Sequence, residues 1–270
     1  MNQRRIKTII GKEWAETIRN KTITGTFAML LVVFTLMPLG FAFGMPLLIG
    51  DEITKDPDVE MLNELLVEMF PQFAALSIIE QFQVFMLRQF LPMFLLVPIM
   101  GAMSIATYSI IGEKTSRSLE ALLATPIRTD ELLLAKSIAA ALPSVGATWG
   151  AFLVFALASR LLGGAEVARY AIDSAAWSMI LLITPLVAFL GLGLGVIVSS
   201  RVNDARSAQQ LGGVLVLPIV GLMVGQTAGL FLLGVPLVII GAVVLFLIDL
   251  AVMAIGVSLF NREAILTRWK

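Results

Sequence analysis

Six long runs of apolar residues constrain the fold of this chain more than any other feature of its sequence. Each run contains the about 20 helical residues that are needed to cross roughly 30 Å of hydrocarbon. The chain is 58% hydrophobic and 14% charged, against about 45–50% and 25% in soluble domains. The predicted spans are 24–49, 89–111, 137–162, 175–199, 211–233 and 235–260. We therefore predict an all-α membrane protein, a single transmembrane domain over residues 1–270 with six transmembrane helices.

The basic residues predict the orientation of these spans. Fifteen of the 19 Lys and Arg residues lie in the segments 1–23, 112–136, 200–210 and 261–270, which all fall on one side of the membrane. An excess of Lys and Arg marks the cytoplasmic face. We therefore expect a multi-pass protein of the cell (plasma) membrane, with both termini and the tail 261–270 in the cytoplasm.

The last two predicted spans, 211–233 and 235–260, are separated only by Gly234. They form either a tight outer hairpin or a region in which one segment is re-entrant and does not reach the far side. Composition does not distinguish these alternatives.

Missing residue types exclude several classes of enzyme. The chain contains no Cys and no His, which excludes zinc sites with these ligands, Cys nucleophiles and Ser-His-Asp triads. It also lacks the Gly-x-x-x-x-Gly-Lys-Ser/Thr phosphate loop. An intramembrane enzyme is a further hypothesis, but the chain has no Gly-x-Gly-Asp protease signature to support it. We expect neither an enzyme nor a cofactor bound by this chain, and the formal net charge of zero gives no indication of nucleic-acid binding.

The first 23 residues predict a helix that lies along the membrane surface. Apolar residues recur there at steps of three or four between basic ones: Ile6, Ile9, Ile10, Trp14 and Ile18. This spacing is typical of an interfacial helix with its Trp at the headgroup level. Lys7 and Glu13 interrupt the apolar face, and the alternative is a basic flank that serves only to fix orientation.

The outer loop, residues 50–88, is strongly acidic. Asp56-Pro57 is typical of a helix N-cap followed by proline at the first helical position, and apolar residues at helical spacing follow as far as Phe70. A second amphipathic stretch, 73–85, leads into the next span. The loop is either a solvated cap or a cover and cation-attracting vestibule.

The cytoplasmic segment 112–136 has the pattern of a docking hairpin. Leu119, Leu122 and Leu123 share one face of a short helix, and Pro126 forces a turn. An apolar ridge with charges beside it is typical of a helix that docks in a partner's groove. The alternative is that these leucines fold back onto neighbouring spans.

Three segments resemble ABC transporter permeases of the type-2 exporter class, in particular the sodium-exporter-permease-like branch. The first comprises Glu113-Lys114, Arg117, Leu119-Glu120, Leu122-Leu123, Thr125-Pro126, Asp130-Glu131 and Lys136, with Arg117-Ser118 as a mild departure. The second comprises Lys12-Glu13-Trp14 and Arg19-Asn20-Lys21, and is similar to the elbow helix of that class. The third comprises Phe260-Asn261-Arg262-Glu263, Ile265-Leu266 and Arg268, and is similar to its C-terminal ending.

This resemblance implies a permease subunit of an ATP-driven exporter. Its partners would be an ABC ATP-binding subunit, which carries ATP and Mg, and a second copy of the permease or a related permease in a dimer. The implied docking residues are Glu113, Arg117, Leu119, Glu120, Leu122, Leu123 and Pro126. The main alternative is a secondary transporter driven by an ion gradient.

Within the predicted spans, one acid and several glycines are candidates for a role. Asp249 lies well inside the last span, where an unpaired charge costs roughly 2.5–3.5 kcal/mol on insertion scales. It either lies on the substrate pathway or is a protonated structural residue that bonds a neighbour, with Gln226, Thr227, Thr184 and Thr107 as candidate partners. Glycines four residues apart predict close helix packing, either within the subunit or across a dimer: Gly146 and Gly150, Gly191 and Gly195, and Gly221, Gly225 and Gly229.

Overall fold

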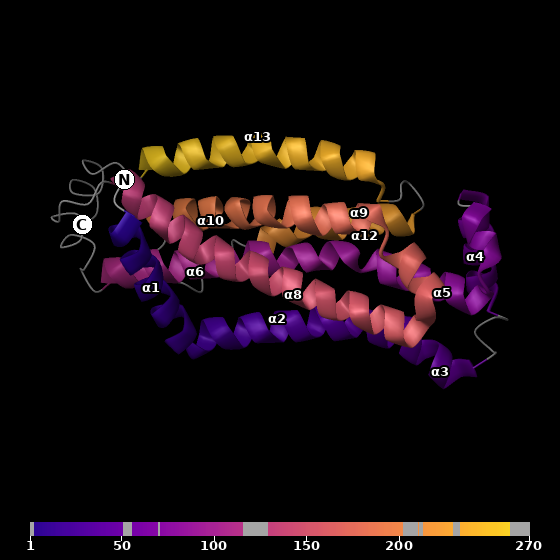
Figure 1. Cartoon of the computed structure of the whole chain (residues 1–270). Coiled ribbons are helices and arrows are strands. Elements are labelled where there is room, and N and C mark those ends of the chain that lie inside the picture. Colours follow the sequence, from indigo (N-terminus) through magenta and orange to yellow (C-terminus); the bar gives the residue numbers. More distant parts are fainter. Residues whose placement is uncertain are drawn as a thin grey trace.

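The protein is a bundle of long helices that run roughly side by side (Figure 1). The computed structural model describes residues 3–50, 56–69, 71–115, 129–201, 210, 213–228 and 233–259. Every regular element within these ranges is helical. Five segments are long and apolar enough to cross a membrane: Lys21–Ile49, Ile78–Gly112, Ala135–Ala171, Ser174–Ser199 and Val235–Gly256. The predicted fold class, an all-α membrane protein, is confirmed.

The first two helices form an elbow at one end of the bundle. Helix α1 (Gln3–Arg19) lies obliquely there, and α2 (Lys21–Leu39) leaves it along the bundle (Figure 1). Asn20 caps α2 because its side-chain oxygen accepts hydrogen bonds from the backbone N–H groups of Thr22 and Ile23 at 3.1 and 3.2 Å. Helix α2 continues through the π-helix η1 (Gly40–Gly44) into α3 (Met45–Ile49). We call the two ends of the bundle the α1 end and the α4 end.

The outer segment is a helix that lies across the α4 end. Helix α4 (Pro57–Met69) begins where the sequence predicts, because Asp56 accepts a hydrogen bond from the backbone N–H of Asp58 at 2.9 Å. The 3₁₀ turn η3 (Pro71–Ala75) and helix α5 (Ile78–Gln89) follow. Helix α5 is no part of a solvated loop: its apolar face packs inside the bundle, where Val84 and Leu87 are fully buried. The predicted loop boundary at residue 88 is therefore too late by about one helix.

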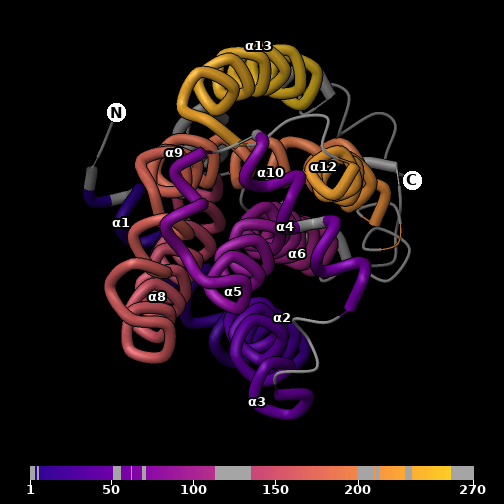
Figure 2. The backbone as a smooth tube through the Cα atoms, turned by 90° about the vertical axis from the view of Figure 1, so that its right-hand side faces the viewer, coloured from indigo at the N-terminus to yellow at the C-terminus, as the bar shows by residue number. Residues whose placement is uncertain are grey.

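The central element is the pair α5 and α6, which the other helices surround (Figure 2). Helix α6 (Leu96–Thr115) continues from α5 through η4 (Leu91–Leu95). In the most apolar window of Ile78–Gly112, 78% of residues are buried, compared with 11% in that of Val235–Gly256. The continuous segment α5–α6 is therefore the core of the fold, whereas α13 (Val235–Leu259) presents most of its surface outward.

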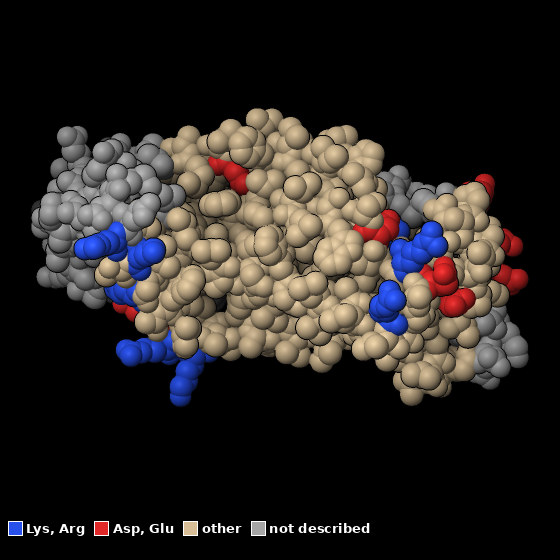
Figure 3. Space-filling model, in the orientation of Figure 1, with Lys and Arg blue, Asp and Glu red and all other residues tan. Residues whose placement is uncertain are grey.

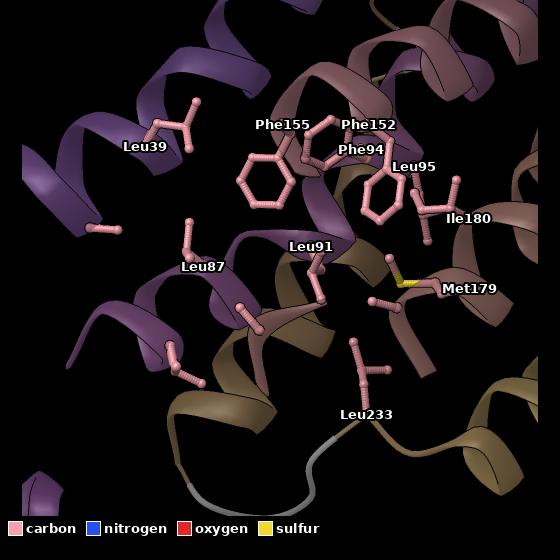
Figure 4. Packing of buried hydrophobic residues seen from close by; sticks show 14 of the residues in the cluster. Leu39, Leu87, Leu91, Phe94, Leu95, Phe152, Phe155, Met179, Ile180 and Leu233 are labelled. Atoms are coloured by element: carbon pink, nitrogen blue, oxygen red, sulfur yellow. The ribbon is translucent and has the colours of Figure 1, made fainter. Parts of the chain in front are cut away.

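The next helices fill the layer around this centre. Helix α8 (Thr129–Ala171) is broken at Gly164, whose φ of +79° only glycine adopts readily. It is followed by α9 (Ser174–Ser178), the π-helix η5 (Met179–Ile183) and α10 (Thr184–Arg201). Buried aromatic rings join these helices to the centre. Phe94 packs edge-on against Phe152 at 5.8 Å between ring centroids, and Phe152 packs edge-on against Trp177 at 5.1 Å. Figure 4 shows Phe94, Phe152 and Phe155 in this cluster.

The predicted span 211–233 is described only in part. Its described part consists of the 3₁₀ turn η6 (Gly213–Leu215) and helix α12 (Val216–Thr227). These 15 helical residues reach about 22 Å at 1.5 Å per residue, against the roughly 30 Å of hydrocarbon. Residues 211–212 and 229–232 of the predicted span lie outside the described part of the chain. A full crossing by 211–233 stays a prediction.

One of the predicted glycine pairs, Gly191 and Gly195, brings two described helices together. A Cβ atom on Gly191 of α10 would lie 2.2 Å from the carbonyl oxygen of Ile99 in α6, and one on Gly195 would lie 3.0 Å from that of Met103. A Cβ atom on Gly146, Gly150 or Gly221 would meet nothing within 4 Å among the described atoms. The close contact of α6 and α10 therefore depends on glycine, whereas Gly146, Gly150 and Gly221 face open space among the described atoms.

We predict that Gly191→Ala lowers stability, because the new methyl group must displace the backbone of α6. Overpacking of this kind costs about 1–3 kcal/mol. The matched control is Gly146→Ala, because a methyl group at position 146 meets open space and alanine forms helices more readily than glycine. This control should leave the thermal midpoint of the detergent-purified protein unchanged or slightly raised. Equal midpoints for the two variants would contradict the close contact of α6 and α10.

Candidate functional site

The predicted docking residues lie almost entirely outside the described part of the chain. Residues 116–128, which contain Arg117, Leu119, Glu120, Leu122, Leu123 and Pro126, are not described, and of Glu113 only the backbone is, within α6. The structure does describe the two helices that lead into and out of this segment. Helix α6 ends at Thr115 and α8 begins at Thr129, both at the α1 end (Figure 1).

A buried ion pair joins α1 to the first turns of α8. The Lys136 ammonium lies 2.9 Å from Oε1 of Glu13, and their side chains are only 10% and 4% exposed. Lys136 also donates to the hydroxyl of Ser109 in α6, and the indole N–H of Trp14 donates to the carbonyl of Ala139 at 3.0 Å. Three helices are therefore held together near the end of α6 and the start of α8, the two helix ends that flank the segment 116–128. We call these two helix ends the roots of the segment. We call Glu13, Lys136, Ser109, Trp14 and Ala139 the clasp.

Burial makes this pair costly to break. Removing water from two charges is unfavourable, and their attraction offsets it only while both are present and hydrogen-bonded. Loss of one partner leaves an uncompensated charge and costs about 3–5 kcal/mol. The clasp therefore favours one relative position of α1, α6 and α8 over nearby alternatives.

A cavity of about 50 Å³ lies beside the clasp. Its walls are mainly apolar side chains of α6, α10 and α13: Ile105, Ala106, Leu192, Val196 and Met253. Glu13, Lys136 and Ser109 form its polar part. The volume suits one or two water molecules. Over the ranges that the structure describes, no three His, Cys, Asp or Glu side chains gather as metal ligands.

At the α4 end a second polar cluster ties helix ends together. The guanidinium of Arg88, at the end of α5, donates to the carbonyls of Tyr170 and Leu233 at 2.9 and 3.1 Å. It also pairs with Asp173 at 3.1 Å, and Asp173 in turn caps α9 by accepting from the N–H of Ala176. Arg88 therefore joins α5 to the end of α8, the start of α9 and the residues before α13.

The next residue, Gln89, extends this cluster to α12. Its side-chain amide donates to the carbonyl of Met223 at 2.7 Å and to the hydroxyl of Thr227 at 2.6 Å. We call Arg88, Gln89 and Asp173 the outer knot. Figure 3 shows Lys, Arg, Asp and Glu gathered toward the two ends of the molecule, with a nearly uncharged surface between them on this face.

Asp249 is buried in α13 with an exposed fraction of 6%. Neither of its carboxylate oxygens has a hydrogen-bond partner among the described atoms. Val252, one turn along the same face, lies against Gly193 of α10, since a Cβ on Gly193 would meet its Cγ1 at 2.5 Å. The acid therefore faces α10 and not open lipid.

The four candidate partners of Asp249 do not reach it. Thr227 bonds Gln89 and Met223 instead. Thr107, Thr184 and Gln226 are buried, and each has side-chain polar atoms without a partner in the described structure. The structural alternative, an Asp that bonds a neighbouring helix, is therefore not supported by any described contact.

Pattern analysis of the sequence missed the residues of both clusters. The apolar periodicity treats Glu13 only as an interruption of a helix face, and no pattern in the sequence singles out Arg88. The resemblance includes Glu13 and Lys136 but does not relate them to each other. An acid on an otherwise apolar face is the one signal that could have indicated a buried pair, because a charge survives burial only with a partner.

We predict that Arg88→Ala destabilises the protein by about 1.5–3 kcal/mol, the usual value of hydrogen bonds to a charged group. The carbonyls of Tyr170 and Leu233 and the carboxylate of Asp173 would lose their partner. The measurement is the thermal midpoint of the purified protein, with exposed Arg160→Ala as the control. A similar fall of the thermal midpoint in both variants would contradict a stabilising role for the contacts of Arg88.

Comparison with known families matches most of the chain. The family model described as ABC-2 family transporter protein matches residues 7–236. Glu13, Arg88 and Lys136 lie within the matched residues, and Asp249 lies outside them. No curated protein matches the chain.

Proposed function

The chain belongs to the ABC-2 family of transporters, and on that premise we propose that it is the permease subunit of an ATP-driven exporter. Permeases of this family are membrane transport components that normally work with an ATP-binding subunit. The exporter would move its substrate out of the cytoplasm by alternating access. The sequence resemblance of residues 108–136 supports the sodium-exporter-permease-like branch as the finer assignment.

The observation that carries the proposal is the fixed geometry of the roots of segment 116–128. Lys136 in α8 bonds Ser109 in α6, and both helices are held against α1. A docking segment can transmit movement only if its roots are rigid, because a loose root absorbs the displacement. The clasp would supply that rigidity at the helix ends to which the docked ATP-binding subunit would transmit its movement.

The α1 end would face the cytoplasm. The excess of Lys and Arg in segments 1–23, 112–136 and 261–270 supports this orientation, as does the acidic helix α4 at the opposite end. The outer knot would then hold the outer ends of α5, α8, α9 and α12 together in this state.

The energy would come from a separate ATP-binding subunit that holds ATP and Mg. The chain has no phosphate loop of its own. The proposed docking residues are Glu113, Arg117, Leu119, Glu120, Leu122, Leu123 and Pro126. A second permease, identical or related, would complete the transporter.

We predict that Leu119→Asp combined with Leu122→Asp abolishes the stimulation of ATP turnover in the complex of permease and ATPase. Two carboxylates on the docking ridge cannot enter an apolar groove without losing hydration. The matched control, Leu119→Met with Leu122→Met, keeps the apolar ridge and should keep stimulation. The thermal midpoint of the permease alone should not change. Normal stimulation in the Asp variant would remove these residues from the docking site.

Asp249 would lie on the pathway of a cationic substrate. Its buried carboxylate lacks a described partner, so it gains more from an incoming cation than a carboxylate already bonded to protein. The same feature keeps an ion-gradient-driven secondary transporter as the second candidate. That candidate requires transport without ATP.

We predict that Asp249→Asn removes the response to cations and preserves the fold, since Asn keeps the shape and loses the charge. The measurement is ATP turnover of the reconstituted complex with added Na⁺ or tetraphenylphosphonium, compared with neutral solutes. Stimulation by cations should fall about tenfold or more, as for loss of a coupling of 1–3 kcal/mol. Unchanged stimulation in Asp249→Asn would make the residue structural.

A further inference from the structure

We propose that the Glu13–Lys136 pair positions α1 so that it moves together with the docking segment and with helices α6 and α8. Movement of the docking segment would then reach α2 through α1 as well as reaching the bundle through α6 and α8. This inference rests on the proposed function, because it presupposes a docked ATPase. It assigns to Glu13, Lys136 and Ser109 a role in transmission.

The position of the pair suits this role. Lys136 lies seven residues into α8, about 10 Å from its start, and Ser109 lies six residues before the end of α6, about 9 Å away. The pair therefore lies just above both roots of the docking segment. Trp14 adds a second attachment one turn further along α8, at Ala139.

The corner between α1 and α2 is also fastened. Asn20 caps α2, and the hydroxyl of Thr24 donates to the carbonyls of Thr17 and Ile18 at 3.2 and 3.3 Å. Ile23, just after the corner, is 6% exposed and packs with Ala102 and Ala140 of α6 and α8. A displacement of α1 would therefore pass to α2 with little loss at the corner.

Helix α2 can carry the movement to the other end. It is continuous with η1 and α3 over Lys21–Ile49, 29 residues. It lies close to α6, where a Cβ on Gly101 would meet the ring of Phe27. The clasp thus connects the docking segment to a helix that runs the length of the bundle.

Stability alone does not explain why this contact is ionic. Replacing a buried ion pair with well-packed apolar side chains of similar volume is often neutral or stabilising. An ionic pair with a shared hydroxyl instead selects one geometry, because a small shift loses the hydrogen bonds. An apolar contact slides with little change in energy.

The test separates stability from transmission in the assembled complex of permease and ATPase. The variants are Glu13→Gln, Lys136→Met, the apolar double Glu13→Leu with Lys136→Met, and the charge swap Glu13→Lys with Lys136→Glu. Two quantities are measured: the thermal midpoint of the permease, and the nucleotide-dependent signal of a fluorophore on Lys7→Cys in α1. The chain has no other cysteine, and Lys7 is exposed, so the label reports α1 alone when the permease is labelled before assembly.

We expect both single variants to lower the thermal midpoint and to reduce the fluorescence change on ATP binding about five- to tenfold. The apolar double should regain the midpoint and not the fluorescence change. The charge swap should regain at least part of both. A full fluorescence change in the apolar double would overturn the proposal and make the pair a structural anchor.

The same experiment distinguishes this failure from failure of the proposed function. If the complex with the unaltered pair shows ATP-dependent fluorescence and the apolar double does too, only the transmission role fails. If an ATPase binds the permease and hydrolyses ATP but the label on α1 does not respond, again only the transmission role fails. If no ATPase binds the permease, the exporter assignment fails with it.

Discussion

A charge inside a membrane protein persists only where another group neutralises or hydrogen-bonds it, and this constraint organises the molecule. The two clusters of paired charge, one buried and one partly exposed, lie at opposite ends of the bundle, where helix ends meet. The clasp joins Glu13 and Lys136 across α1, α6 and α8. The outer knot joins Arg88 to Asp173 and to two carbonyls. Between them the bundle is held by aromatic packing and by the close approach of α6 and α10 at Gly191.

This arrangement suits a protein that changes state by moving rigid helices. Interfaces packed without space tend to switch between discrete arrangements, since they do not deform continuously. The polar clusters at the helix ends each favour one relative position of their helices, and the central contact of α6 with α10 depends on backbone proximity and resists sliding. Asp249 is the exception, a buried acid on the most exposed helix that no described residue balances.

Much of the fold followed from local pattern. Apolar run length predicted five of the helical segments, and Asp56-Pro57 predicted the start of α4. The same reasoning did not place the described end of α12 at Thr227, where the side chain of Gln89 bonds this helix. It also assigned 73–88 to an outer loop, although the apolar face of α5 is buried against helices distant in sequence. Among the predicted glycine spacings, Gly191 and Gly195 proved to be a contact between described helices, whereas a Cβ atom on Gly146 or Gly150 would have no described neighbour within 4 Å.

The sequence by itself determined that this chain enters a membrane as helices and which ends of those helices carry basic residues. These conclusions depend on composition, local spacing and motifs, which need no knowledge of neighbours. Only the tertiary structure decided which charges meet. Glu13 and Lys136 are 123 residues apart along the chain, and no periodicity relates them. They pair because folding places α1 across the start of α8, where the ammonium of Lys136 lies 2.9 Å from the carboxylate of Glu13.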